Sequence, residues 1–131
     1  MIIRVYEDRD FDQVKRLHES SGLPAVCMPD LQSPLFCVKL CAEKQKRITQ
    51  AGFLKLTAEA FVLVDREAGT PGERWATLQE LTAATLAEAY ARGLDDVTAW
   101  VPPALEKGFG RRLIELGWIR SPWQSYSALL R

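Results

Sequence analysis

The chain is poor in the residues that most active sites and cross-links use. Its 131 residues include one histidine, His18, and three cysteines, Cys27, Cys37 and Cys41. A single histidine gives no basis for a Ser-His-Asp or Cys-His site and leaves a zinc site short of ligands. Cys37 and Cys41 lie four apart in a strand-like run, about 13 Å from each other, too far for a disulfide within one strand. We therefore predict no metal and buried free thiols, as in a reducing cytoplasm.

The chain also lacks an excess of either charge. It has 17 Lys and Arg against 17 Asp and Glu, so its overall charge indicates neither nucleic acid nor a membrane surface as a partner. No apolar run is long enough to cross a bilayer, and the N-terminus lacks a signal-peptide layout. The length and the 47% hydrophobic content suit one globular domain, which we predict over residues 1–131 in the cytoplasm.

The first half of the sequence alternates apolar runs with polar turns. A strand is predicted at residues 2–5, followed by a helix that begins at Asp10 as N-cap, with Gln13 three residues later as in a capping box, and ends at Gly22. Further strands are predicted at residues 35–42, 48–56 and 60–64. The run at 60–64 is apolar without a break, which favours burial on both faces in the centre of a sheet.

The second half predicts two helices between strands. A long amphipathic pattern starts near Pro71 and stops at Gly93, and a second apolar stripe runs from Leu105 to Leu116 before Gly117. Strands are predicted within residues 94–101 and at 118–120 and 123–130. The order favours an α/β (α+β) fold, with a mixed, mostly antiparallel sheet of six or seven strands and helices on both faces.

The link between residues 60–64 and the long helix carries the strongest hint of chemistry. Asp65 to Gly72 includes Gly69 and Gly72 and leads directly into the helix. Backbone N–H groups at such a place can hold a phosphate at the positive end of the helix. The alternative is an ordinary strand-to-helix turn in which the glycines only permit tight backbone angles.

Three motifs resemble the GNAT family of N-acetyltransferases. Residues 3–14 look like its first strand and helix, Arg66-Glu67-Ala68-Gly69-Thr70-Pro71 looks like its pyrophosphate loop, and Leu113-Ile114-Glu115-Leu116-Gly117-Trp118 is similar to the end of its late helix. Two positions depart from the family pattern. Pro71 replaces a small residue and has no N–H to donate. Leu113 replaces the tyrosine that acts as general acid.

The resemblance implies acetyl-CoA as co-substrate and an amine as acceptor. Backbone groups of Val62 and Val64 would hold the pantetheine arm, and the pyrophosphate would lie against Arg66, Gly69, Thr70, Gly72 and Arg74. Glu59 is the candidate base and Tyr126 a further catalytic candidate. The acceptor, a small molecule or a peptide amine, is not specified by the sequence.

Two functions stay open at this point. The first is an acyl-CoA-dependent N-acyltransferase that moves acetyl to an amine. The second is a non-catalytic descendant that binds a partner or forms a homodimer. The retained glycines and Arg66 favour the enzyme, whereas Pro71 and Leu113 favour the second. Trp100 and Trp123 would line an acceptor pocket in the first case and a partner surface in the second.

Overall fold

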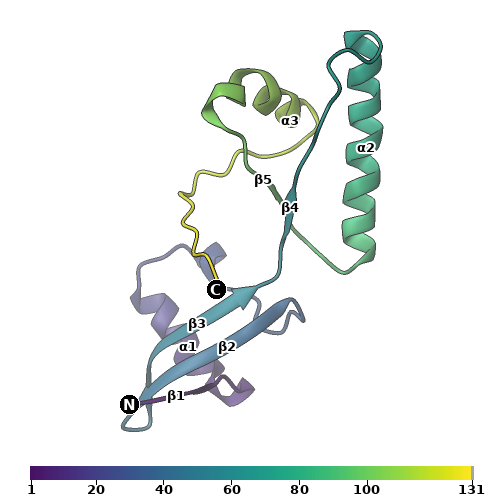
Figure 1. Cartoon of the computed structure of the whole chain (residues 1–131). Coiled ribbons are helices and arrows are strands. Elements are labelled where there is room, and N and C mark those ends of the chain that lie inside the picture. The colour runs from purple at the N-terminus through teal and green to yellow at the C-terminus, as the bar shows by residue number, and fades with distance from the viewer. Residues whose placement is uncertain (131) are drawn as a thin grey trace. The chain divides into compact units, whose positions relative to one another are not determined.

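A computed structural model describes residues 1–130 and divides the chain into two compact units (Figure 1). Unit 1 consists of Met1–Ala58 with Leu94–Asp96, and unit 2 of Glu59–Gly93 with the residues from Val97 onward. The expectation that residues 1–131 behave as one domain stays a prediction.

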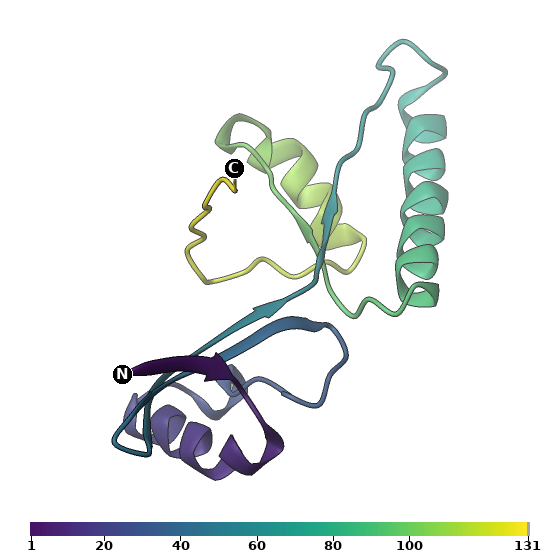
Figure 2. The same ribbon diagram turned by 60° about the horizontal axis from the view of Figure 1, so that its bottom comes forward.

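Unit 1 is a three-stranded antiparallel sheet with a helix on one face (Figure 2). Its elements are β1 (Ile2–Val5), the 3-10 turn η1 (Asp8–Asp10), α1 (Phe11–Ser20), η2 (Ala25–Cys27), β2 (Phe36–Lys44) and β3 (Arg47–Lys55). The strand order is β1-β2-β3, so β2 is central and pairs with both neighbours. The three strands and the helix predicted for this part of the sequence are confirmed within a few residues.

The β2–β3 hairpin has a tighter turn than the sequence suggested. Only Gln45 and Lys46 lie between the strands, and both have positive φ angles, 52° and 61°. Two central residues with positive φ form the hairpin turn whose twist matches that of the strands. The charged residues expected to form a longer turn therefore extend β2 to Lys44 and start β3 at Arg47.

A small core forms between α1 and the sheet. Its buried side chains come from α1, β2 and β3, from the residue that follows β1 and from the loop before β2: Tyr6, Val14, Leu31, Cys41 and Ile48. The Tyr6 and Phe53 rings meet edge to face with their centroids 5.8 Å apart, a favourable aromatic geometry. This cluster is the interior that holds α1 against the strands.

The three cysteines differ in burial, which corrects the expectation of three buried thiols. Cys41 is buried in the core, Cys27 is half-buried and Cys37 is exposed, with its Sγ directed to the Leu54 carbonyl. Burial raises the pKa of the Cys41 thiol. Cys41 is therefore a packing residue rather than a reactive one.

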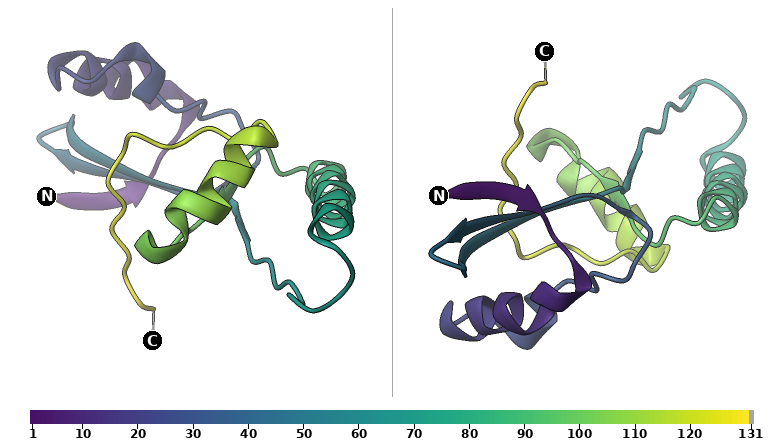
Figure 3. Two further views of the ribbon diagram at one scale, coloured as in Figure 1. Left: turned by 90° about the horizontal axis from the view of Figure 1, so that it is seen from above. Right: turned by 90° about the horizontal axis from the view of Figure 1, so that it is seen from below.

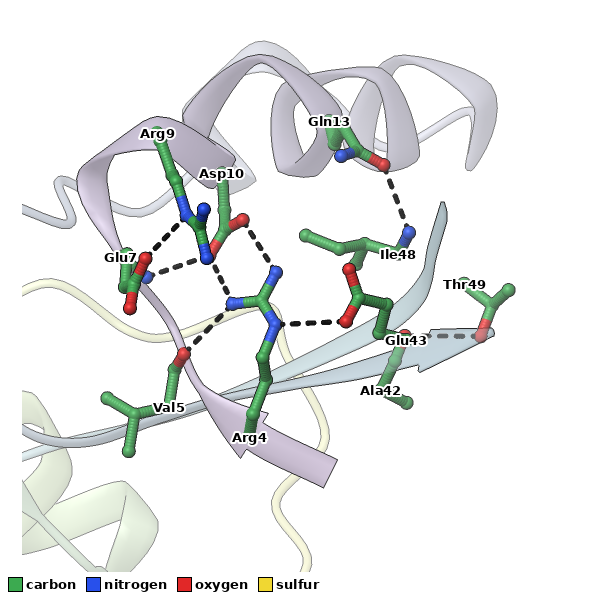
Figure 4. A network of polar contacts seen from close by, with 10 residues as sticks. All are labelled: Arg4, Val5, Glu7, Arg9, Asp10, Gln13, Ala42, Glu43, Ile48 and Thr49. Atoms are coloured by element: carbon green, nitrogen blue, oxygen red, sulfur yellow. Dashed lines mark hydrogen bonds and ion pairs between the residues drawn. The ribbon is translucent and has the colours of Figure 1, made fainter. Parts of the chain in front are cut away.

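Asp10 fixes the start of α1 through an ion pair with Arg4 and through a capping box with Glu7 in the turn before the helix (Figure 4). The Asp10 carboxylate accepts two hydrogen bonds from the Arg4 guanidinium, at 2.7 and 2.8 Å, and one from the Glu7 N–H at 2.8 Å. Gln13 instead accepts a hydrogen bond from the Ile48 N–H at 3.0 Å, which joins α1 to β3. The predicted Asp10–Gln13 pair is wrong because a bidentate guanidinium binds a carboxylate more strongly than a neutral backbone donor does.

Unit 2 contains one long helix and several short elements. They are β4, which starts at the last residue of unit 1 (Ala58–Ala60), α2 (Pro71–Ala91), β5 (Val97–Ala99), η3 (Pro103–Leu105), the π-helical turn η4 (Glu106–Gly110) and α3 (Arg111–Glu115). β4 and β5 form a two-stranded parallel sheet. The long helix predicted after Pro71 is confirmed, and Gly93, with φ 86°, follows its end.

The expected sheet of six or seven strands with helices on both faces is wrong. Residues 1–130 form an α+β structure with five strands in two separate sheets. Of the fourth predicted strand, residues 60–64, only Ala60 belongs to β4. Of the fifth, only Val97–Ala99 is paired. Residues 118–120 and 123–130 form no strand. An apolar run becomes a strand only where a neighbour accepts its hydrogen bonds, and Pro122 removes a donor between the last two segments.

The late helix is also shorter than predicted. Instead of one helix from Leu105 to Leu116, the chain makes a 3-10 turn, a π-helical turn and a five-residue α-helix. Gly108 and Gly110 lie in the π-helical turn, where they lower helix propensity. Gly117 ends the segment with φ 90°, as predicted.

Candidate ligand-binding site

The predicted phosphate loop borders a pocket of unit 2. After β4 the chain runs extended through residues 61–65, turns, and then starts α2, which lies beside it (Figure 3). A cavity of about 360 Å³ lies between this extended segment and the first half of α2. The residues that line it are Val62, Leu63, Val64, Asp65, Ala68, Gly69, Glu73, Arg74, Thr77, Leu78 and Leu81.

One wall of the pocket is a strand-like segment without a partner strand. Among the residues that the structure describes, nothing hydrogen-bonds to the backbone of Val62, Leu63 or Val64. The segment was expected to be a buried central strand, but the Phe61 side chain is 82% and the Leu63 side chain 97% exposed. Its backbone donors and acceptors are thus available to a ligand, as at the open edge of a sheet.

The opposite wall is the start of α2, and it is closed by a capping box. Thr70 is the N-cap, and its hydroxyl accepts a hydrogen bond from the Glu73 N–H at 3.1 Å. The Glu73 carboxylate in turn accepts one from the Thr70 N–H at 2.8 Å. Pro71 has no N–H. Of the amides that could hold an anion here, two are therefore already used within the protein.

Gly69 and Arg74 fix the loop that leads to this helix. Gly69 has φ 66°, a left-handed angle that glycine adopts without strain. A β-carbon at this position would collide with the Glu73 carboxylate. The Arg74 guanidinium donates to the Gly69 carbonyl at 2.8 Å and to the Ala68 carbonyl at 3.4 Å. The loop is therefore built around a carboxylate that lies over Gly69.

The structure brings together only some of the residues predicted to bind acetyl-CoA. Val62, Val64, Gly69 and Arg74 line the pocket, whereas Arg66, Thr70 and Gly72 do not. Arg66 is exposed in the turn after Asp65. The catalytic candidates lie elsewhere in unit 2: Glu59 is exposed on β4, and Tyr126 is 95% exposed in the segment after α3.

The residue that sequence reasoning missed is Glu73. Its signal was present, because a threonine followed three residues later by a glutamate at a helix start is the pattern of a capping box. Thr70 was instead predicted only as a phosphate ligand. The charged side chains that line the pocket are Asp65, Glu73 and Arg74, two carboxylates and one guanidinium.

Comparison of the chain with protein-family models, curated proteins and solved structures finds no match. Within residues 1–130 no group of three or more His, Cys, Asp and Glu side chains is arranged to hold a metal ion. In the same residues no helix combines the length and the hydrophobicity needed to cross a membrane.

Proposed function

We propose that the pocket beside α2 binds the thioester arm of an acyl-CoA and that the chain transfers its acyl group to an amine. One observation carries the proposal: an extended segment with unpaired backbone groups, residues 62–64, forms a wall of a 360 Å³ cavity. A pantetheine arm is a chain with two amide groups. It would add to this segment as a further strand does, through main-chain hydrogen bonds.

Unpaired hydrogen-bond donors remain near the same pocket. The N–H groups of Gly69 and Gly72 have no partner among the described residues, and neither do Nε and Nη2 of Arg74. These donors suit the amide oxygens of a pantetheine arm, whereas a phosphate at the helix start would also meet the Glu73 carboxylate. The sequence resemblance to N-acetyltransferases in residues 66–71 supports the same placement, although the two small sheets are not the sheet of that family.

The reaction requires a neutral amine and a way to protonate the leaving group. The amine nitrogen attacks the thioester carbonyl, the new C–N bond forms, and collapse of the oxyanion breaks the C–S bond and releases a thiolate. Glu59 as base and Tyr126 as a further catalytic residue stay predictions. Both lie outside the lining of the pocket, and Leu113 offers no proton.

A second function is favoured by a specific observation. The capping box of Thr70 and Glu73 satisfies two amides internally, which a non-catalytic domain would tolerate and a diphosphate site would not. In addition, Trp100 is 55%, Trp123 65% and Tyr126 95% exposed. Exposed aromatic residues are enriched at protein interfaces. A partner-binding or dimerising domain without acyl transfer is thus the second candidate.

Ligand-dependent stabilisation tests the first proposal. Acetyl-CoA at millimolar concentration should raise the melting temperature of the protein, because a ligand that binds only the folded state stabilises it. Arg74→Gln should reduce the rise, whereas Arg92→Gln, at the other end of α2, should leave it unchanged. No shift with the wild-type protein would reject the acyl-CoA site and leave the second candidate.

Catalysis is tested separately from binding. Release of free CoA thiol should accelerate when the protein is given acetyl-CoA and a panel of small amines and peptides with free N-termini. Binding without thiol release across the panel would support a binding domain. Because the exposed side of the pocket is open to solvent, slow hydrolysis without an amine is the baseline to subtract.

A further inference from the structure

The carboxylate of Glu73 occupies the place where a diphosphate would approach α2. Its Oε2 accepts the Thr70 N–H at 2.8 Å and lies so close above Gly69 that a β-carbon there would collide with it. Both Gly69 and Glu73 line the pocket. The positive end of the helix is thus already neutralised by an acid of the protein itself.

The charged residues around the pocket also disfavour a diphosphate. Asp65 and Glu73 face it with negative charge, and Arg74 alone is positive. Arg74 already gives hydrogen bonds to the Gly69 and Ala68 carbonyls. A diphosphate at this site would meet a like charge at Glu73, and like charges a few ångströms apart repel each other.

The remaining lining suits an uncharged chain. Val62, Leu63, Val64, Leu78 and Leu81 supply apolar side chains, and the extended segment supplies unpaired amide groups. Amide-bearing aliphatic ligands match this combination, because they bury methylene groups and satisfy backbone donors and acceptors together.

We propose that Glu73 is the specificity-determining residue of this pocket: it excludes the diphosphate, so that the protein recognises its donor through the acyl-pantetheine arm and accepts pantetheine thioesters that carry no nucleotide. This inference rests on the proposed function, since it names the part of the acyl donor that is bound. The chemistry is unchanged: the acyl group passes to an amine, and the pantetheine thiol takes up the proton.

Binding of two donors to three proteins tests the inference. Affinities of acetyl-CoA and S-acetyl-pantetheine are measured by calorimetry for the wild type, Glu73→Gln and the control Glu80→Gln, an exposed position further along α2. The dissociation constants of the wild type for the two donors should lie within about threefold of each other. Glu73→Gln should strengthen acetyl-CoA binding by tenfold or more at low salt and leave S-acetyl-pantetheine unchanged. Glu80→Gln should change neither.

The variant is chosen to preserve the fold. Glutamine at this position still completes a capping box, and melting followed by circular dichroism checks that α2 is retained. A wild type that prefers acetyl-CoA by tenfold or more, or a folded Glu73→Gln protein without gain for acetyl-CoA, would overturn the inference and leave the acyl-CoA site intact. Failure of both donors to bind any of the three proteins would overturn the inference together with the proposed function.

Discussion

At the scale of single residues, the best-defined interaction is the contact between Arg4 and Asp10. Asp10 is 3% exposed, and its carboxylate is satisfied by the Arg4 guanidinium and the Glu7 N–H. Arg4 also reaches Glu43 on the neighbouring strand at 3.3 Å. A buried carboxylate is stable only when it is paired in this way. The pair therefore ties β1 to the turn before α1.

Because of this pair, the stability of unit 1 should decrease at low pH. Hydrogen bonds from Arg4 lower the pKa of Asp10 from 3.8 to about 2, although burial opposes the shift. Because the folded-state value is the lower one, the stabilisation is complete above about pH 4 and is lost as the pH falls from about 3.8 to about 2. Asp10→Asn should cost about 1.5–3 kcal/mol at pH 7, the range for hydrogen bonds to charged groups.

Urea unfolding between pH 2 and pH 7 checks this prediction. The difference in unfolding free energy between wild type and Asp10→Asn should shrink towards the acid end of the range. Asp12→Asn, an exposed neighbour in α1, serves as control and should change stability by less than about 0.5 kcal/mol. A difference that is constant down to pH 2 would show that the Arg4–Asp10 pair has no part in acid stability.

At the scale of elements, Gly69 and Gly72 of the predicted phosphate loop have different roles. Gly69 lies before α2 with a left-handed φ, under the Glu73 carboxylate. Gly72 lies within the first turn of α2, and a β-carbon there would meet only the Thr70 hydroxyl at 3.9 Å, an ordinary contact. Only at position 69 does the backbone angle favour a glycine.

Alanine substitution separates these roles. Gly69→Ala should lower the stability of unit 2 by about 1–2 kcal/mol, because an L-residue is strained at that angle and its methyl group displaces Glu73. Gly72→Ala should be neutral or stabilising by up to about 1 kcal/mol, because alanine is the better helix former. Urea unfolding followed by tryptophan fluorescence measures both. Equal losses for the two variants would mean that the glycines serve the same purpose.

The sequence was a good guide to elements that carry their own local signal. The start of α2 near Pro71 and its end before Gly93 followed from the proline and glycine rules for helix ends, and the β2–β3 hairpin followed from successive apolar runs. Strand pairing was harder to predict. Residues 61–64 have the composition of a buried strand, yet whether they pair depends on distant segments that a local pattern does not contain.

The same limit applies to the site. The loop at Gly69 was found from its spacing, but Thr70 was interpreted as a phosphate ligand when its donor and acceptor are both engaged by Glu73. A hydrogen bond between two local groups competes with any ligand for the same atoms. The pocket itself brings together residues far apart in the sequence, such as Val62 and Leu81, and a local motif does not contain that information.

At the scale of the whole molecule, the two units differ in how much they bury. Unit 1 has a core that includes Val14, Cys41 and Ile48, whereas Gly110 is the one buried residue among those described in unit 2. Burial of apolar side chains is the main source of folding free energy. On this ground unit 2 should unfold at a lower urea concentration than unit 1.

The distribution of reporter residues allows each unit to be followed alone. All four tryptophans, Trp75, Trp100, Trp118 and Trp123, belong to unit 2, so fluorescence reports on that unit. The buried thiol of Cys41 belongs to the core of unit 1, so its labelling, resolved by mass spectrometry, reports on unit 1.

Ile48→Ala should move Cys41 labelling to lower urea, since removing a buried isoleucine side chain costs about 2–5 kcal/mol. The fluorescence midpoint should stay in place. If both signals move together, residues 1–131 unfold as one cooperative domain, and the single-domain expectation from the sequence holds instead.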